Sequence, residues 1–150
     1  NPLLLAFASG YTWIARGYAY DVKGLKELIK EGIAHRGLAF LHVLQPCPTY
    51  NDLHTKEWFA PRLYRLEEEG YDPLVPPGLP PEALEARMAR FQQKALEWGE
   101  RIPVGVFWKA ELPTFEARLK AYLPRYPEAY PARGPETPLD LEGLLQEFAL

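Results

Sequence analysis

The sequence contains a single cysteine, Cys47, among its 150 residues. One thiol cannot form an intramolecular disulfide, and it cannot by itself build a cysteine-ligated metal site. Serine and methionine are equally scarce, since each occurs once, whereas there are 16 prolines. Few thermolabile residues together with proline-rich loops are devices found in thermophile proteins, so we expect a thermophilic source.

The chain also lacks an excess of positive charge. Seventeen Lys and Arg stand against 20 Asp and Glu, which gives a net charge of -3 and makes nucleic acid or an anionic membrane an unexpected partner. No apolar run approaches the roughly 20 residues of a membrane span, and no cationic segment precedes the apolar run at 2–8. We therefore expect a cytoplasmic protein. Because removal of an initiator methionine normally leaves a small residue, Asn1 suggests that the chain begins inside a longer protein.

The first third of the sequence predicts a βαβ unit. Residues 11–16 (YTWIAR) are rich in aromatic and β-branched side chains, which favours a strand. Apolar residues then recur at helical spacing between Asp21, a candidate N-cap, and Gly37. Residues 38–44 (LAFLHVL) are almost all apolar, which is typical of a strand covered on both faces. We expect two parallel strands joined by a right-handed crossover.

The remainder predicts a helix-rich, proline-rich extension after a polar loop at 45–56 (QPCPTYNDLHTK). Its expected elements are helices at 61–70, 81–98, 114–122 and from 137 onward, a strand at 102–108, and extended connectors at 71–81 and 124–138. The fold class is therefore α/β.

Cys47 is the first candidate site residue. Ligands of open parallel sheets bind beyond the carboxyl ends of the strands, and Cys47 follows such an end closely. Thr49 and Asn51 of the same loop could bind a cofactor, although turn chemistry alone also explains them. Arg16 and Tyr18 are placed just after the other strand, where they could face a cofactor or serve in ion pairing or an interface.

Two simpler interpretations of Cys47 stay open at this point. A lone cysteine is most often an inert small residue. It could also be a nucleophile activated by His42 or His54, although the first lies in an apolar strand and the second in a polar loop. The run 67–69 (EEE) is a weak candidate metal patch, because acidic runs are usually solvated.

Several segments in order resemble the carboxyl-terminal part of the beta subunit of 2-oxoacid:ferredoxin oxidoreductases. They are the tripeptide 15–17 (ARG), the helix at 22–37, the segment 38–51 (LAFLHVLQPCPTYN) and the segment 101–116 (RIPVGVFWKAELPTFE). The loop Pro-Cys-Pro-Thr-Tyr-Asn is the most specific of them. This resemblance implies a division into residues 1–56, the end of a thiamine-diphosphate-binding α/β domain with a parallel sheet, and residues 57–150, the carboxyl-terminal extension of the beta subunit.

The resemblance also implies an activity and its cofactors. Enzymes of this family decarboxylate a 2-oxoacid oxidatively, form an acyl thioester with coenzyme A and pass electrons to ferredoxin. Their beta subunit holds thiamine diphosphate, Mg²⁺ and, in most members, a 4Fe-4S cluster, and it assembles with an alpha subunit. Cys47 resembles the last of four cluster ligands. The other three cysteines and the Gly-Asp-Gly motif of the diphosphate site lie upstream in the family and are not in this sequence.

The chain alone is therefore expected to be inactive, with its cofactors completed by the amino-terminal half of the subunit. No catalytic residue is assigned. Two other functions are kept as alternatives: a non-catalytic interaction domain that assembles with a partner chain, and a hydrolase that depends on Cys47.

Overall fold

The computed structural model describes residues 1–123 and 146. Residues 1–112 form one compact unit, and a second unit begins at Pro113. The first unit holds helices α1 (Pro2–Ala8), α2 (Val22–Ala34), α3 (Lys56–Phe59) and α4 (Pro81–Leu96), the 3-10 turn η1 (Glu67–Glu69), and strands β1 (Trp13–Tyr18), β2 (Ala39–Leu44), β3 (Leu63–Arg65), β4 (Leu74–Val75) and β5 (Ile102–Ala110). The second unit holds α5 (Phe115–Tyr122), which the Thr114 side chain caps.

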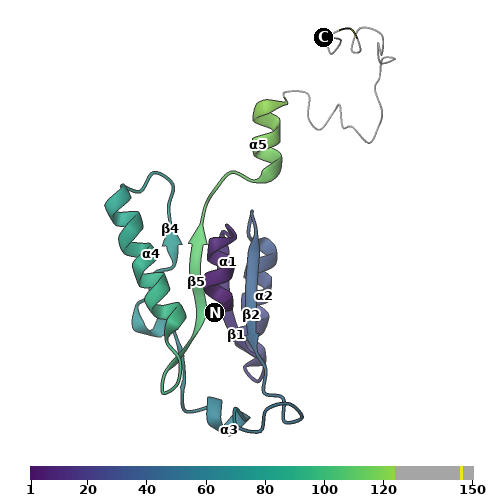
Figure 1. The fold of residues 1–150 in the computed structure, drawn as a ribbon, viewed down its shortest axis with the longest axis vertical. Coiled ribbons are helices and arrows are strands. Elements are labelled where there is room, and N and C mark those ends of the chain that lie inside the picture. The colour runs from purple at the N-terminus through teal and green to yellow at the C-terminus, as the bar shows by residue number, and fades with distance from the viewer. Residues whose placement is uncertain (124–145, 147–150) are drawn as a thin grey trace. The chain divides into compact units, whose positions relative to one another are not determined.

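The five strands form one mixed sheet in the order β2-β1-β5-β3, with β4 also paired to β5 (Figure 1). β1 and β2 are parallel, from the pair Trp13 and Ala39 to the pair Tyr18 and Leu44. β5 runs antiparallel to β1, whereas β3 and β4 run parallel to β5. The carboxyl ends of β1 and β2 therefore lie at the same edge of the sheet as the amino end of β5.

Helix α2 packs on one face of the sheet over β1 and β2. Gly17 makes this approach possible, because a Cβ atom there would lie 2.8 Å from the Leu25 side chain. Gly32 of α2 does the same for the Trp13 ring, from which its Cβ would lie 3.1 Å. The two glycines explain how bulky neighbours pack tightly here without a clash.

Helices α1 and α4 contribute to the main hydrophobic core with β1 and β5. Phe91 of α4 contacts Phe7 of α1 and Trp108 of β5, with ring centroids 4.8 Å and 5.8 Å apart. Ile14 pairs with Trp108 but Ala15 pairs with Val106, so Phe107 is an extra residue in β5. This bulge allows Phe107 and Trp108 to contribute to the same core, although they are adjacent in a strand.

The structure confirms the βαβ unit and the two helices predicted at 81–98 and 114–122, which run over Pro81–Leu96 and Phe115–Tyr122. The predicted helix at 61–70 is wrong, because β3 and η1 occupy this segment and β3 pairs with β5. The first strand runs from Trp13 to Tyr18 rather than over 11–16, and the expected connector at 71–81 includes β4. The extension is therefore not helical throughout, since its strands complete the same sheet. The division at residue 56 stays a prediction about the complete protein.

The predicted helix from 137 onward and the connector at 124–138 lie outside the described residues. Among the helices that the structure does describe, none has the length and apolar character required to cross a membrane.

Candidate functional site

The loop that follows β2 lies at the carboxyl edge of the parallel pair, next to α3 (Figure 1). Pro46 is buried, and the Cys47 side chain is partly exposed beyond it. The Cys47 carbonyl accepts hydrogen bonds from the backbone N–H groups of Tyr50 (3.1 Å) and Asn51 (2.8 Å). The thiol therefore stands at the start of a tight turn, which the flanking prolines stiffen.

Asn51 and Thr49 have different positions in this turn. The Asn51 Oδ1 atom accepts hydrogen bonds from the N–H groups of Leu53 and His54, each at 3.0 Å, so its side chain holds the turn itself. Thr49 is exposed within the turn. Both side chains are exposed, and the Oδ1 atom of Asn51 is already engaged in the turn.

The two histidines considered as activators of Cys47 have other partners. Nδ1 of His42 accepts a hydrogen bond from Nε of Arg16 at 3.4 Å, while burial and then the Arg16 charge lower the pKa of the imidazole. Nδ1 of His54 lies 3.0 Å from Nδ2 of Asn51, and the ring packs against Trp58 at a tilt of 57°. Neither histidine forms a hydrogen bond with Cys47 among the described residues, so the geometry gives no support to a cysteine hydrolase.

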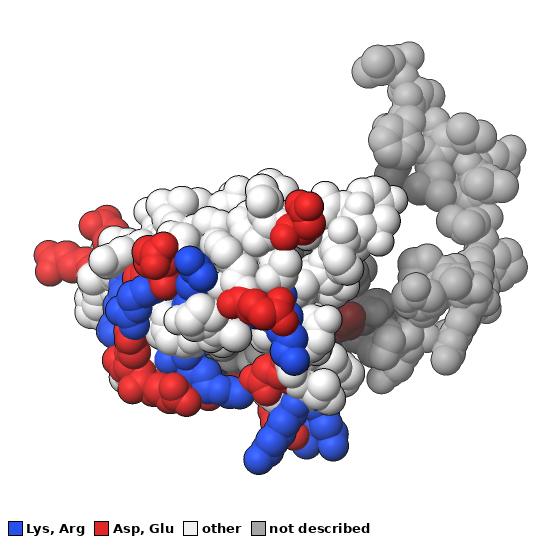
Figure 2. All heavy atoms as spheres, turned by 90° about the horizontal axis from the view of Figure 1, so that it is seen from below, with Lys and Arg blue, Asp and Glu red and all other residues white. Residues whose placement is uncertain are grey.

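Apolar side chains form a second core beneath this edge. It comprises Tyr18, Leu44, Phe59, Ile102 and Val104, with Trp58 and Leu63 packed against it. Seen from this end of the molecule, Lys and Arg are absent from the upper part of the view and lie in its left and lower parts (Figure 2). The exposed aromatic side chains Tyr20, Tyr50 and Trp98 make the edge suitable for a contact with another protein surface.

Arg16 and Tyr18 lie inside β1 and not after its end, which corrects their expected position. Arg16 is only 1% exposed, and its guanidinium lies 5.3 Å from the Phe107 ring centroid and 5.7 Å from that of Trp98. No carboxylate among the described residues pairs with it, and burial lowers its pKa to about 10. The Tyr18 hydroxyl is also buried without a hydrogen-bond partner among those residues. Two polar groups below the Cys47 loop are therefore incompletely satisfied.

We predict that Arg16→Met raises the free energy of unfolding of this chain by about 1–3 kcal/mol, because a buried charge without a counterion is replaced by an apolar side chain of similar length. The lowered pKa of Arg16 agrees with this predicted stabilisation, because it shows that the folded state disfavours the charged guanidinium. Urea unfolding followed by tryptophan fluorescence measures the change. A loss of stability of about 1 kcal/mol or more would show instead that stacking on Phe107 and Trp98 outweighs the cost of burying the charge.

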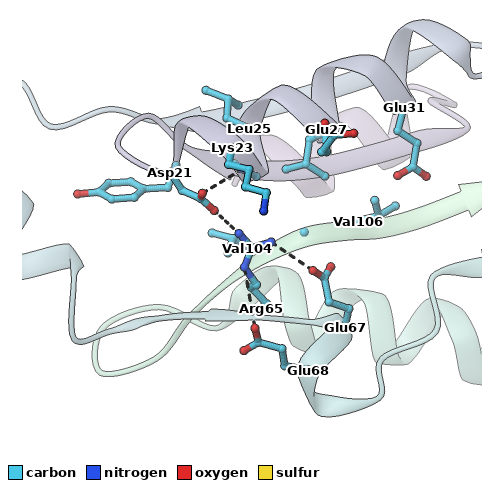
Figure 3. A pocket seen from close by; sticks show the side chains of 15 residues that line it. Asp21, Lys23, Leu25, Glu27, Glu31, Arg65, Glu67, Glu68, Val104 and Val106 are labelled. Atoms are coloured by element: carbon cyan, nitrogen blue, oxygen red, sulfur yellow. Dashed lines mark hydrogen bonds and ion pairs between the residues drawn. The ribbon is translucent and has the colours of Figure 1, made fainter.

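A groove of about 520 Å³ lies beside α2, over the part of β5 that the helix does not cover. Figure 3 shows Arg65 reaching from β3 into it, where it pairs with Asp21 and with Glu67, the latter at 3.2 Å. Asp21 also caps α2 as predicted, because its Oδ1 accepts from Gly24 N at 2.9 Å. The sequence did not indicate the Asp21–Arg65 pair, because the two residues lie far apart in the chain. Gly24 leaves room for the pair, since a Cβ atom there would clash with both side chains.

The acidic run 67–69 is occupied by ion pairs. Glu69 pairs with Arg101 and lies 3.8 Å from Lys94 Nζ, while Glu67 pairs with Arg65. In the part of the chain that the structure describes, no group of three or more His, Cys, Asp or Glu side chains could hold a metal ion. The solvated, ion-paired interpretation of this run therefore fits better than a metal patch.

These features define part of an α/β protein whose carboxyl strand edge carries a stiff, cysteine-bearing loop. The family model for the C-terminal region of the pyruvate ferredoxin oxidoreductase beta subunit matches residues 47–123, and the chain belongs to this family. The match begins at Cys47, so it includes the loop as well as the strands and helices that follow it.

Curated relatives give the same family. The chain is 53% identical over 135 residues to a 2-oxoacid:ferredoxin oxidoreductase subunit beta from Sulfolobus sp, covering 89% of the chain and 43% of the relative. It is 48% identical over 156 residues to the protein of the same description from Saccharolobus solfataricus, covering 98% of the chain and 50% of the relative. The chain thus spans half the length, or less, of these relatives.

A solved structure shares the fold. It is a 2-oxoglutarate:ferredoxin oxidoreductase from Magnetococcus marinus, determined with 2-oxoglutarate, coenzyme A and succinyl-CoA bound. The TM-score is 0.65 at 24% identity, and the similarity covers 100% of this chain and 45% of that one. The predicted α/β class is confirmed.

Proposed function

We propose that this chain supplies the carboxyl-terminal part of the beta subunit to an enzyme that oxidatively decarboxylates 2-oxoacids to acyl-CoA and passes the electrons to ferredoxin. The observation that carries the proposal is the family match beginning at Cys47, together with the position of this thiol at the carboxyl edge of β1 and β2. The other components are an alpha subunit and the amino-terminal half of the beta subunit.

Cys47 is proposed as one ligand of a 4Fe-4S cluster. Its thiol is partly exposed, lies in a turn restrained by Pro46 and Pro48, and has no disulfide partner, so it is available for ligation. A stiff loop suits a cluster ligand because it fixes the direction of the sulfur. The chain has no further cysteine, so the remaining thiolates come from outside it.

The described residues do not form a complete site for thiamine diphosphate and Mg²⁺, because they contain no cluster of carboxylates able to hold a metal ion. We propose that the diphosphate and Mg²⁺ ligands belong to the amino-terminal half. Arg16, Thr49 and Asn51 of this chain are then the residues that border the assembled site, with Asn51 shaping the loop and Thr49 exposed on it. Arg16 contributes a buried positive charge that lacks a counterion among the described residues.

When bound, thiamine diphosphate supplies the electron sink for decarboxylation, and the cluster supplies one-electron transfer. The residues of this chain position the Cys47 sulfur and exclude water from the edge of the sheet. The apolar core below the loop, which includes Tyr18, Leu44 and Phe59, lowers the local dielectric constant. A lower dielectric constant strengthens the electrostatic interaction between Arg16 and any charged group bound near it.

The experiment is a fusion of the amino-terminal half of the Saccharolobus solfataricus relative to this chain, co-expressed with the alpha subunit of that organism. We expect a brown protein with a visible iron-sulfur absorption band and with 2-oxoacid-dependent, coenzyme-A-dependent reduction of ferredoxin. The chain alone is expected to be colourless and inactive. A folded fusion that binds no iron and ignores added 2-oxoacids would contradict the proposal.

A further inference from the structure

Arg16 is a buried positive charge without a negative partner among the described residues. Its side chain is 1% exposed, and it donates only long hydrogen bonds, from Nε to His42 Nδ1 at 3.4 Å and from Nη1 to the Pro103 carbonyl at 3.5 Å. Burial lowers its pKa to about 10, so the guanidinium keeps its charge at neutral pH. A buried charge of this kind is costly unless a negative group compensates it.

The contacts of Arg16 lead to the turn that holds Cys47. The guanidinium lies 5.7 Å from the Trp98 ring centroid, and that centroid lies 6.3 Å from the centroid of the His54 ring. Nδ1 of His54 is 3.0 Å from Nδ2 of Asn51, whose backbone N–H donates a hydrogen bond to the Cys47 carbonyl. Trp98 and His54 thus connect the buried charge to the turn.

The strand register limits the distance between Arg16 and Cys47. Arg16 pairs with His42 across the two parallel strands, and neighbouring strands lie about 4.8 Å apart. Cys47 follows His42 along the chain, and a segment of this length spans at most about 18 Å. The Cα atoms of Arg16 and Cys47 are therefore separated by no more than roughly 20 Å.

The other charged side chains of the Cys47 loop and of α3 are open to water. They are Asp52, Lys56 and Glu57. Arg62, which follows α3, is less exposed but lies 3.7 Å from a carboxylate oxygen of Glu100. Solvent and salt screen exposed charges strongly, whereas a buried charge is screened much less. Of the described charges around this turn, that of Arg16 is therefore the least screened.

We propose that Arg16 raises the reduction potential of the cluster that Cys47 ligates, by stabilising the reduced state electrostatically. A 4Fe-4S cluster held by four thiolates carries a net negative charge, and its one-electron reduction adds another. A fixed positive charge favours the more negative of the two states. The electron comes from the 2-oxoacid and leaves to ferredoxin, as in the proposed function, which this inference deepens and on which it rests.

The expected size of the effect follows from Coulomb's law. At roughly 20 Å and an effective dielectric constant of about 20, the loss of one positive charge changes the equilibrium between oxidised and reduced cluster by about fourfold. For a one-electron couple, this change corresponds to roughly 35 mV. A shorter separation gives a larger change, so about fourfold is the smallest shift that we expect.

The test is a redox titration of the fused protein with its alpha subunit, with dithionite as the reductant and electron paramagnetic resonance as the measure of reduced cluster. Arg16→Met removes the charge, and we expect it to lower the ratio of reduced to oxidised cluster at the wild-type midpoint by about fourfold or more. Arg16→Gln also removes the charge but keeps an amide donor for His42, and it should give the same shift. Iron analysis shows that each variant holds its cluster.

Two controls separate the charge from other effects. Arg87→Met removes a charge whose side chain is 32% exposed and pairs with Asp72 at 3.0 Å, so the ratio should change by less than about twofold. Phe107→Leu removes a ring that lies beside Arg16 but leaves the charge in place. It too should change the ratio by less than about twofold.

Each outcome decides the matter. A potential that is unchanged in both Arg16 variants overturns the inference, and so does an equal shift in Arg87→Met or Phe107→Leu. If a carboxylate outside the described residues neutralises Arg16, its variants leave the potential unchanged and make the fusion less stable to urea, which also overturns the inference. A fusion without a cluster removes the proposed function together with this inference. An active fusion whose potential does not depend on Arg16 removes this inference alone.

Discussion

In the fused protein, Cys47→Ser is expected to lower the iron content and ferredoxin reduction by about tenfold or more, because the cluster loses one of its thiolate ligands. A hydroxyl group has a similar size but is a far weaker iron ligand than a thiolate. The stability of the chain alone is expected to change by no more than about 0.5 kcal/mol, since Cys47 is partly exposed and makes no disulfide. Iron analysis, visible absorption and electron paramagnetic resonance of the reduced protein measure the effect on the cluster.

Thr49→Val is the matched control for this variant. It lies in the same turn and is exposed, but it offers no iron ligand in either form. It should retain the iron content of the unmodified fusion, whereas the affinity for thiamine diphosphate is expected to change, because Thr49 borders the proposed thiamine site. A Cys47→Ser protein with full iron content and an unchanged resonance spectrum would remove Cys47 from the ligand set.

The βαβ unit could be predicted because its information is local. Apolar residues at helical spacing, Asp21 as a cap and Gly37 as a stop define α2 without knowledge of any other segment. The position of Cys47 at the strand edge then follows from the rule that ligands of parallel sheets bind beyond the carboxyl ends. The order of the strands and the helix along the chain was therefore enough to predict where Cys47 lies.

The segment 61–70 could not be predicted in the same way. Pro61 and Gly70 are typical helix boundaries, and the pattern between them does not exclude a helix. β3 forms instead because Leu63, Tyr64 and Arg65 pair with residues 102–104, far along the chain. Such a pairing depends on tertiary contacts that no local pattern records.

The position of Arg16 shows the same limit within the site. Its strand extends to Tyr18 because β1 is paired with β2 throughout this region, and β5 adds pairs up to Arg16. The sequence indicated a polar residue near a strand end, but its burial against Phe107 and Trp98 depends on β5 and on the segment between α4 and β5. The cluster and thiamine sites could not be built at all from this chain, since the ligands proposed for them lie mostly in another segment.

Phe91→Ala is expected to destabilise the chain by about 3–5 kcal/mol, which is a large share of the roughly 5–15 kcal/mol typical of a folded domain. Phe91 is fully buried, and it joins three elements through its contacts with Phe7 of α1 and Trp108 of β5. Removal of the ring loses the transfer free energy, leaves a cavity and breaks two aromatic contacts. Urea unfolding at equilibrium measures the loss.

Leu96→Ala provides the control on the same helix, because Leu96 is 61% exposed at the end of α4. Its expected change is within about 0.5 kcal/mol. If Phe91→Ala cost less than about 1 kcal/mol, the layer of α1 and α4 would not be packed on the sheet as described. If it costs the expected amount, the Phe91 ring is confirmed as a packed contact between α4, α1 and β5. Because Phe107 and Trp108 belong to the same core, this contact supports the bulged part of β5 that lies beside Arg16.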